Sequence, residues 1–192
     1  NQPGSGMHFH VSLWDAEGRG LFACPDGRQD LGPLGPAFIA GVLAHAPALC
    51  ALAAPTVNSY KRLTVGESLS GTTWAPAYVA QGPNNRTCTV RTLPGRFEWR
   101  LPDASANPYL ATAALIAAGL DGIDRGLTPP AACTEDLFAL SLAEVRARGI
   151  AVLPQSLGEA VDALAEDPVV TGALGSALSA EFIRLKRAEW LE

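Results

Sequence analysis

The segment GRFEWRLPD, residues 95–103, alternates polar and apolar side chains. Successive side chains of a β-strand point to opposite faces, so Phe97, Trp99 and Leu101 would share one face. The opposite face would carry Arg96, Glu98 and Arg100. Burial in a core explains the apolar face. The polar face holds a carboxylate between two guanidinium groups, and the rest of the sequence must indicate what that face contacts.

Neighbouring segments predict more strands. AYVAQ (77–81) and TCTVRTL (87–93) are joined to each other by GPNNR and to RFEWRL by the turn PG. Three strands with short links predict an antiparallel meander. GMHFHVSLWD (6–15) also alternates, which places His8, His10 and Ser12 on one face of a further strand. Its other face carries Met7, Phe9, Val11 and Leu13.

Two apolar segments predict helices. Residues 36–55 are helical by composition, although Pro47 splits them and Gly41 weakens them. Residues 102–126 begin with turn residues and continue as an alanine-rich helix, with Asn107 as its cap and Pro108 at its first position. We therefore expect an α+β fold: an antiparallel sheet packed with helices over residues 1–126, followed by a helical C-terminal region over residues 127–192.

Composition excludes several functional classes. The 192 residues are 48% hydrophobic and 17% charged, which is typical of a globular protein. The net charge of −5 argues against a nucleic-acid partner. No apolar run reaches transmembrane length and no signal peptide opens the chain, so we expect no membrane partner. The cysteines have no C-x-x-C spacing and are interpreted as reduced thiols of a cytoplasmic protein. Because the chain begins with Asn1 rather than methionine, we expect it to be part of a longer protein.

The polar faces of the predicted strands carry groups that bind metals and anions. If the strands share a sheet, one side carries His8, Glu98 and at least four arginines. Histidine and glutamate are ordinary ligands of a divalent metal, and Mg²⁺ or Mn²⁺ is favoured over zinc where phosphate is present. The guanidinium fork binds phosphate or carboxylate oxygens two at a time. A nucleotide, a metal and an anionic substrate therefore form a coherent set.

Each feature also has a simpler interpretation. An Arg-x-Glu-x-Arg strand is usually a solvated face with cross-strand ion pairs. A single His-x-His is usually not a ligand pair, and GSG before it is too short for a phosphate loop. Asp103 is expected to cap the turn PDASANP, and LDGIDRG (120–126) to be a helix end with solvated acids. The functional interpretation depends on the combination.

Five blocks in this order resemble the C-terminal part of the catalytic domain of the glutamine synthetase family, and the resemblance extends over the whole chain. The blocks are GSGMHFHVSL (4–13), NSYKRL (58–63), NNRTCTVR (84–91), RFEWRLPDASANPYLATAALIAAGLDGI (96–123) and SLGEAVDAL (156–164). The divergent bacterial branch of glutamate–polyamine and glutamate–methylamide ligases is the most similar. The resemblance implies ATP-dependent ligation of glutamate to ammonia or a primary amine through γ-glutamyl phosphate. It also implies Mg²⁺ or Mn²⁺ and a homo-oligomeric ring.

The resemblance also implies roles for residues that would bind metal and glutamate. His8 matches a metal-ligand histidine, and Glu98 matches a carboxylate ligand of the same ion. Arg62 and Arg100 match arginines that hold the carboxylates of glutamate, and Arg62 is also expected to act in catalysis. Gly4 matches a backbone contact to glutamate.

A second group matches positions that contact ATP. His10 and Ser12 match two such positions. Arg86, Arg91 and Arg96 match arginines that neutralise the ATP phosphates, and Arg86 is expected to act in catalysis on the transferring phosphoryl group. By this resemblance, the polar face of RFEWRL would contact metal, ATP phosphate and glutamate. Phosphoryl transfer needs such charge neutralisation more than covalent chemistry.

Some positions depart from the family. Pro3 stands before Gly4 where the family has asparagine. Ammonia-using members carry a glutamate just before an Ala-Pro pair, and here that residue is Trp74, after the long loop 64–74. An aromatic ring offers cation–π contact and favours an organic amine over ammonia. Alternatively, Trp74 only packs the loop and Glu67 replaces the acid.

The N-terminal β-grasp domain of the family, and the strands with most of its metal-binding glutamates, would precede residue 1. We therefore expect the 192 residues alone to fold but to be inactive. Three rival interpretations stay open: a glutamine synthetase that uses ammonia, a guanidino kinase, and a non-catalytic binding or structural relative. The guanidino kinase is disfavoured because its family lacks the His-x-His strand and NSYKRL.

Overall fold

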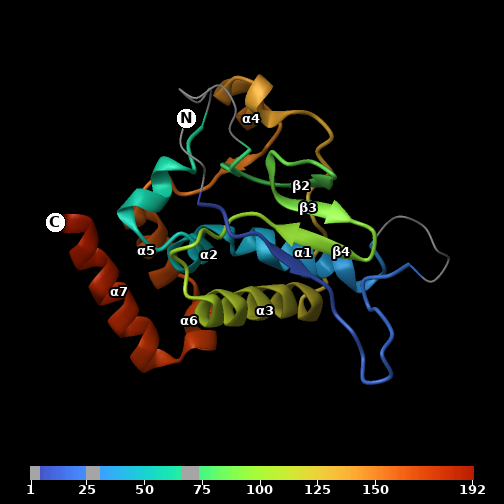
Figure 1. Ribbon diagram of the computed structural model, residues 1–192, viewed down its shortest axis with the longest axis horizontal. Coiled ribbons are helices and arrows are strands. Elements are labelled where there is room, and N and C mark those ends of the chain that lie inside the picture. Colours follow the sequence, from blue (N-terminus) through green and yellow to red (C-terminus); the bar gives the residue numbers. More distant parts are fainter. Residues whose placement is uncertain (1–4, 25–30, 66–73) are drawn as a thin grey trace.

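The computed structural model describes residues 5–24, 31–65 and 74–192. Its strands form one sheet with the order β1-β4-β3-β2-β5. The strands are β1 (Phe9–Val11), β2 (Tyr78–Pro83), β3 (Cys88–Leu93), β4 (Arg96–Trp99) and β5 (Ala151–Val152). Figure 1 shows the sheet above the long helices, with the C-terminal helix at one end of the molecule.

Helices cover the sheet, and the α+β class is confirmed. The α-helices are α1 (Leu34–Ala44), α2 (Ala46–Ala53), α3 (Pro108–Asp124), α4 (Leu142–Ala147), α5 (Leu157–Ala165), α6 (Pro168–Leu174) and α7 (Ser176–Leu191). Short 3₁₀ helices span Val57–Lys61 and Leu137–Ala139. The predicted start of α3 is confirmed, because the Asn107 side chain accepts hydrogen bonds from the first turn and Pro108 opens the helix.

One predicted strand pairing is wrong. β3 and β4 are antiparallel, but β2 and β3 are parallel, with Tyr78 opposite Cys88 and Pro83 opposite Thr92. GPNNR is therefore not a hairpin turn. Asn84 adopts a left-handed conformation (φ 51°), and the Asn85 side chain accepts a hydrogen bond from the Thr87 amide. The segment 84–87 consequently runs back alongside β2 before β3 begins.

The apolar faces predicted for β1 and β4 are confirmed. Phe97 and Trp99 are fully buried, and Phe97 packs against the rings of Phe22 and Phe38 at centroid distances of 6.0 and 5.8 Å. Phe9 meets Trp99 edge-on, with a centroid distance of 5.7 Å. Burial of these rings orients both strands, so their alternate side chains must project from the opposite face.

Helices α1 and α3 cross with their backbones in contact. A Cβ at Gly41 would lie 2.0 Å from the carbonyl oxygen of Ala118, and one at Gly122 would lie 2.2 Å from that of Ala37. Gly41 is therefore required because a larger residue would not fit between the two helices. The low helix propensity of glycine does not reveal this packing role. Figure 1 shows α1 behind β4 and α3 below them.

The C-terminal region joins this core. β5 pairs with β2, and α5 buries Leu157, Val161 and Leu164 in the main hydrophobic cluster. Within the described residues, no single helix is long and apolar enough to cross a membrane, and α1 with α2 meets those criteria only as a pair bent by 74°. The bend falls at His45, just before Pro47, which occupies the first turn of α2.

A partly buried cluster of His45, Asp121 and Asp167 links this bend to α3 and to the start of α6. His45 Nδ1 lies 2.6 Å from Asp167 Oδ2, and His45 Nε2 lies 3.0 Å from Asp121 Oδ2. Burial alone would lower the pKa of His45, but hydrogen bonds to both carboxylates outweigh it and raise the pKa above its ordinary 6.5. Asp121 is therefore not one of the solvated acids expected at this helix end.

We expect this cluster to make stability depend on pH. Since the pKa of His45 is raised in the folded state, its stabilisation is complete below pH 6.5 and is lost as pH rises through the folded pKa. His45→Gln should lower the free energy of unfolding by about 1–3 kcal/mol at acidic pH and should remove this slope. Urea unfolding across a pH series measures both effects. His10→Gln, at an exposed histidine, is the control, and an unchanged slope in His45→Gln would contradict the assignment.

Candidate active site

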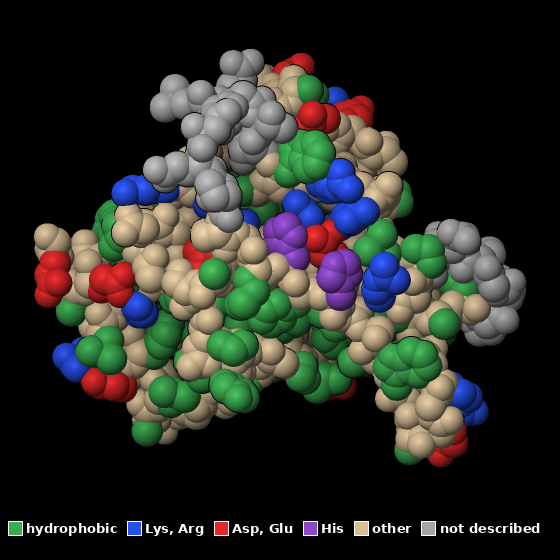
Figure 2. Space-filling view, in the orientation of Figure 1, with side chains coloured by type: hydrophobic (Ala, Val, Ile, Leu, Met, Phe, Trp, Pro, Cys, Tyr) green, Lys and Arg blue, Asp and Glu red, His purple; other side chains and the backbone are tan. Residues whose placement is uncertain are grey.

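The site is built on the polar face of three adjacent strands. β4 lies between β1 and β3, and its Glu98 is opposite His10 on one side and Arg91 on the other. Because the alternate residues of β4 are locked in the core, Glu98 and Arg100 must face the other way. On this side of the molecule, histidine side chains lie beside basic side chains and an acidic one (Figure 2).

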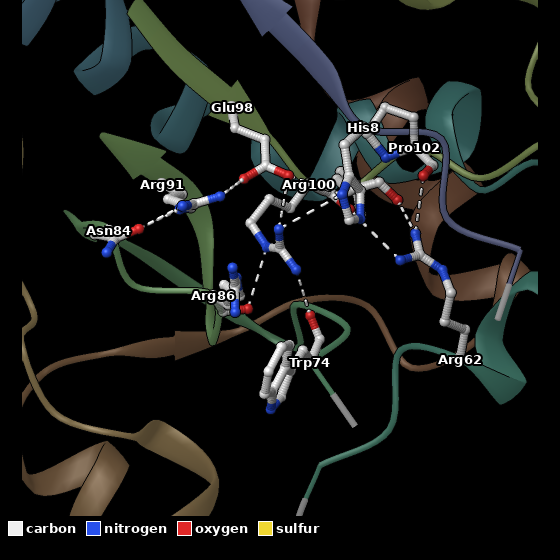
Figure 3. A network of polar contacts seen from close by, with 10 residues as sticks. His8, Arg62, Trp74, Asn84, Arg86, Arg91, Glu98, Arg100 and Pro102 are labelled. Carbon is white, nitrogen blue, oxygen red and sulfur yellow. Dashed lines mark hydrogen bonds and ion pairs between the residues drawn. The ribbon is translucent and has the colours of Figure 1, made fainter. Parts of the chain in front are cut away.

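Glu98 is the centre of the site. Its Oε1 accepts a hydrogen bond from Arg100 Nη1 at 2.7 Å and lies 2.8 Å from His8 Nδ1. Its Oε2 accepts from Arg91 Nη1 at 3.0 Å. Glu98 is 4% exposed, so this carboxylate is buried and shared among three cationic or polar partners (Figure 3).

Arg100 links this carboxylate to two loops. Its Nε donates to the Arg86 carbonyl at 3.1 Å, and its Nη2 donates to the Trp74 carbonyl at 2.8 Å. Every nitrogen of this guanidinium group therefore contacts a different partner, as Figure 3 shows. The Arg86 guanidinium in turn lies over the Trp74 ring, 4.8 Å from its centroid. Arg100 thus fixes the end of loop 64–74 relative to Glu98.

Arg62 stands at the other end of the site and contacts the backbone after β4. It donates hydrogen bonds to the carbonyls of Leu101 and Pro102, the latter at 3.1 Å. A Cβ at Gly6 would lie 3.0 Å from His8 Nε2 and 3.5 Å from Arg62 Nη1, so only a small residue fits between them. Arg62 therefore lies beside His8, where Figure 3 also places it.

Electrostatics keep the carboxylate charged and the imidazole neutral. Burial would raise the pKa of Glu98, but hydrogen bonds from Arg91 and the charge of Arg100 outweigh it and lower the pKa. Burial, followed by the charge of Arg100, lowers the pKa of His8, although Glu98 opposes this. With one carboxylate among several guanidinium groups, the site carries net positive charge and favours an anion.

The predicted site residues are placed as follows. The structure brings together His8, Arg62, Arg86, Arg91, Glu98 and Arg100. His10 is exposed and pairs with Glu98 across β1 and β4. Arg96 is exposed at the start of β4. The Ser12 hydroxyl accepts a hydrogen bond from the Trp14 indole at 3.0 Å. Gly4 and Glu67 lie outside the described residues.

Some groups of the site were not predicted. The carbonyls of Trp74 and Arg86 bind Arg100, and the Asn84 side chain accepts a hydrogen bond from Arg91 Nε at 3.0 Å. Backbone carbonyls leave no residue-type signal in a sequence. Asn84 could have been suspected because asparagine tolerates the left-handed conformation that it adopts here.

The spacing of His8 and Glu98 is compatible with two adjacent ligands of one divalent metal ion. Their nearest atoms are 2.8 Å apart, and adjacent ligands of an octahedral ion with bonds of about 2.1 Å lie roughly 3 Å apart. Metal ligation requires a neutral imidazole, which the lowered pKa of His8 supplies. Among the described residues, no group of three or more His, Cys, Asp or Glu side chains could hold an ion. If an ion binds here, His8 and Glu98 would be two ligands of a larger set.

An α+β fold with an Arg- and His-lined face around a buried glutamate suits the class of enzymes that bind nucleotides and acidic substrates. The model of the glutamine synthetase catalytic domain matches residues 1–192, and the chain belongs to that family. The predicted family is thereby confirmed.

Individual relatives agree. The chain is 52% identical over its whole length to the glutamate–methylamine ligase of Methyloversatilis universalis, of which it covers 43%. It is 46% identical to the glutamine synthetase of Halobacterium salinarum, with 98% of this chain and 41% of that protein covered. The solved structure "GmaS/ADP complex-Conformation 1" superposes with a TM-score of 0.87 at 46% identity, covering 98% of this chain and 43% of that one. The chain spans less than half the length of these relatives.

Proposed function

We propose that the protein uses ATP to ligate glutamate to a primary amine through γ-glutamyl phosphate, in the cytoplasm and as a homo-oligomeric ring. The observation that carries the proposal is the buried Glu98, shared by His8, Arg91 and Arg100 on one polar face. The names of the relatives, glutamate–methylamine ligase and glutamine synthetase, support glutamate as the acid substrate.

Different residues of this face would have different roles in phosphoryl transfer. His8 and Glu98 would hold Mg²⁺ or Mn²⁺, which supplies charge neutralisation at the phosphate oxygens. Arg86, Arg91 and Arg96 would hold the phosphates of ATP, with His10 and Ser12 toward the nucleotide. In-line transfer depends on such positioning and charge neutralisation, which these cations provide.

Arg62 and Arg100 would hold the carboxylates of glutamate, with Gly4 as a further contact. A γ-carboxylate oxygen attacks the γ-phosphorus, and the bond from that phosphorus to ADP breaks. The amine nitrogen then attacks the γ-carbonyl carbon, phosphate leaves, and the amine loses a proton. Arg62 lies beside His8, so the glutamate would lie next to the metal ligands.

Trp74 supports an organic amine as the acceptor. Its side chain is 51% exposed, and its ring already lies against the Arg86 guanidinium. A ring that accepts one cation can accept an alkylammonium group, whereas ammonium is more strongly hydrated and gains less from an apolar surface. ADP release by the full-length protein, with glutamate fixed and the amine varied, tests the function. Higher kcat/KM for ammonia than for every amine would favour a plain glutamine synthetase, and no ADP release with any acceptor would favour a non-catalytic relative.

Trp74→Ala should change acceptor preference. Loss of a cation–π contact of about 0.5–2 kcal/mol should lower the ratio of kcat/KM for methylamine to that for ammonia by about 2- to 30-fold. The ratio is measured within one variant, so a loss of folded protein cancels. Trp74→Phe retains a ring and should keep the ratio within about threefold. If Trp74→Ala has the parental ratio, Trp74 only packs the loop.

A further inference from the structure

The Arg91 side chain is held between two acceptors on different sides of its guanidinium group. Its Nη1 donates a hydrogen bond to Glu98 Oε2 at 3.0 Å. Its Nε donates to Asn84 Oδ1 at 3.0 Å, and its Nη2 donates to the same oxygen. Figure 3 shows Arg91 between these two partners. Since the guanidinium group is planar and rigid, contacts at two places on its edge fix its orientation as well as its position.

The backbone presents Asn84 to Arg91. Asn84 is the first residue after β2, and its amide donates to the Thr92 carbonyl at 3.0 Å. Its φ of 51° is a left-handed conformation, which asparagine tolerates better than most residues. The next residue is anchored separately, because Asn85 Nδ2 donates to the carbonyl of Cys133 at 3.0 Å. The acceptor oxygen of Asn84 therefore projects from a loop that is fixed on both sides.

A neutral acceptor at this place orients Arg91 without cancelling its charge. Arg91 already shares the carboxylate of Glu98 with His8 and Arg100. A second carboxylate would neutralise the guanidinium group, whereas the amide of Asn84 leaves it attractive to an anion. Within the described residues, the three bonds occupy three of its five N–H groups, so two can donate to a ligand. The Arg91 side chain is 17% exposed, so a ligand can reach it.

We propose that Asn84 is a positioning residue, which orients Arg91 so that its remaining N–H groups bind a phosphate group. The phosphate is that of the nucleotide, so this inference rests on the proposed function. Asn84 contacts neither the substrate nor the metal and acts only through Arg91. Without the bond to Asn84, the Arg91 side chain would sample more rotamers. A bound phosphate would then have to immobilise it, which weakens binding.

Two substitutions separate this role from the backbone conformation of the loop. Glycine and aspartate both tolerate a left-handed residue, so neither should change the path of the chain. Asn84→Gly removes the acceptor oxygen. Asn84→Asp keeps an acceptor oxygen but adds a negative charge beside Arg91. Thermal unfolding of both variants, made in the full-length protein, checks that they fold.

Modification by phenylglyoxal, a reagent that attacks guanidinium groups, reports how firmly each arginine is held. Peptide mapping of the full-length protein gives a rate for each site. Arg91 should react about 2- to 10-fold faster in Asn84→Gly, because the bond to Asn84 no longer restrains it. In Asn84→Asp it should react no faster than in the parent. Arg125, which donates a hydrogen bond to Asp121, is the internal control and should keep its rate.

Calorimetric titration with ADP and Mg²⁺ measures the consequence for nucleotide binding. Asn84→Gly should weaken ADP binding by about 2- to 10-fold, because binding must now order the Arg91 side chain. Asn84→Asp should also weaken ADP binding, although Arg91 stays held, because the added charge repels phosphate. The KM for glutamate should be unchanged in Asn84→Gly, since Arg91 is not among the residues that would hold glutamate. A general loss of structure would change both affinities.

Unchanged reactivity of Arg91 in Asn84→Gly would overturn the proposal. Parental ADP affinity in Asn84→Gly, with Arg91 reacting faster, would overturn it as well. Absence of ADP binding by the parent protein would overturn the proposed function and the phosphate role of Arg91. The reactivity with phenylglyoxal requires no nucleotide, so it would still decide whether Asn84 holds Arg91. The failure of this inference is therefore distinguishable from the failure of the proposed function.

Discussion

Glu98→Gln in the full-length protein is expected to reduce ATP-dependent phosphoryl transfer to glutamate by about 10²- to 10⁴-fold. In the proposed function Glu98 would hold the metal, and a metal-binding carboxylate supplies several kcal/mol of charge stabilisation. Glutamine keeps the shape and one acceptor oxygen but loses the charge shared by His8, Arg91 and Arg100. No other carboxylate on this face of β4 can replace it. Single-turnover ADP formation with saturating ATP and glutamate measures the loss.

Glu181→Gln is the matched control, since Glu181 forms an exposed ion pair with Arg184 on α7, away from the site. That variant should retain parental turnover. Thermal unfolding of Glu98→Gln separates a chemical loss from a loss of folded protein. If folded Glu98→Gln has a turnover within tenfold of the parent, Glu98 is not a ligand of the metal.

Arg100→Lys is expected to lower kcat/KM for glutamate by about 10²- to 10⁴-fold. Hydrogen bonds to charged groups are worth about 1.5–3 kcal/mol each, and a lysine ammonium cannot reproduce a fork that contacts Glu98, Arg86 and Trp74 in different directions. The charge is retained, so the loss reports geometry rather than electrostatics. Steady-state kinetics with glutamate varied gives the value.

Arg184→Lys makes the same substitution on the exposed face of α7 and should leave kcat/KM unchanged. The Arg100→Lys variant should also lose the hydrogen bond to the Trp74 carbonyl, which positions Trp74. Its ratio of kcat/KM for methylamine to kcat/KM for ammonia should therefore fall, as in Trp74→Ala. If kcat/KM for glutamate stays within about fivefold of the parent, Arg100 does not position the site.

The sequence predicted those parts of the fold that follow from burial. Phe97 and Trp99 alternate with Glu98 because a strand against a core must alternate, and the same argument placed His8 and His10 on the polar face of β1. The pairing of β4 with β1 and β3 then brings the polar side chains of these strands together. The family resemblance added expected roles, and these roles stay predictions.

Other parts depend on backbone geometry that residue types do not encode. The parallel pairing of β2 and β3 depends on the left-handed conformation of Asn84 and the side-chain bonds of Asn85. Asp121 resembled a solvated helix-end acid because its partner, His45, lies 76 residues away in the chain. Long-range partners of this kind become visible only once the helices are packed.

The place of β1 in the sheet has a consequence during biosynthesis. Among the described residues, β1 pairs with β4, which is made much later in the chain. At synthesis rates of about 5–20 residues per second, β1 leaves the ribosome several seconds before β4 exists. The pairing of β1 with β4 must therefore wait until β4 has been made. The contact between His8 and Glu98 consequently forms only when most of the sheet has been translated.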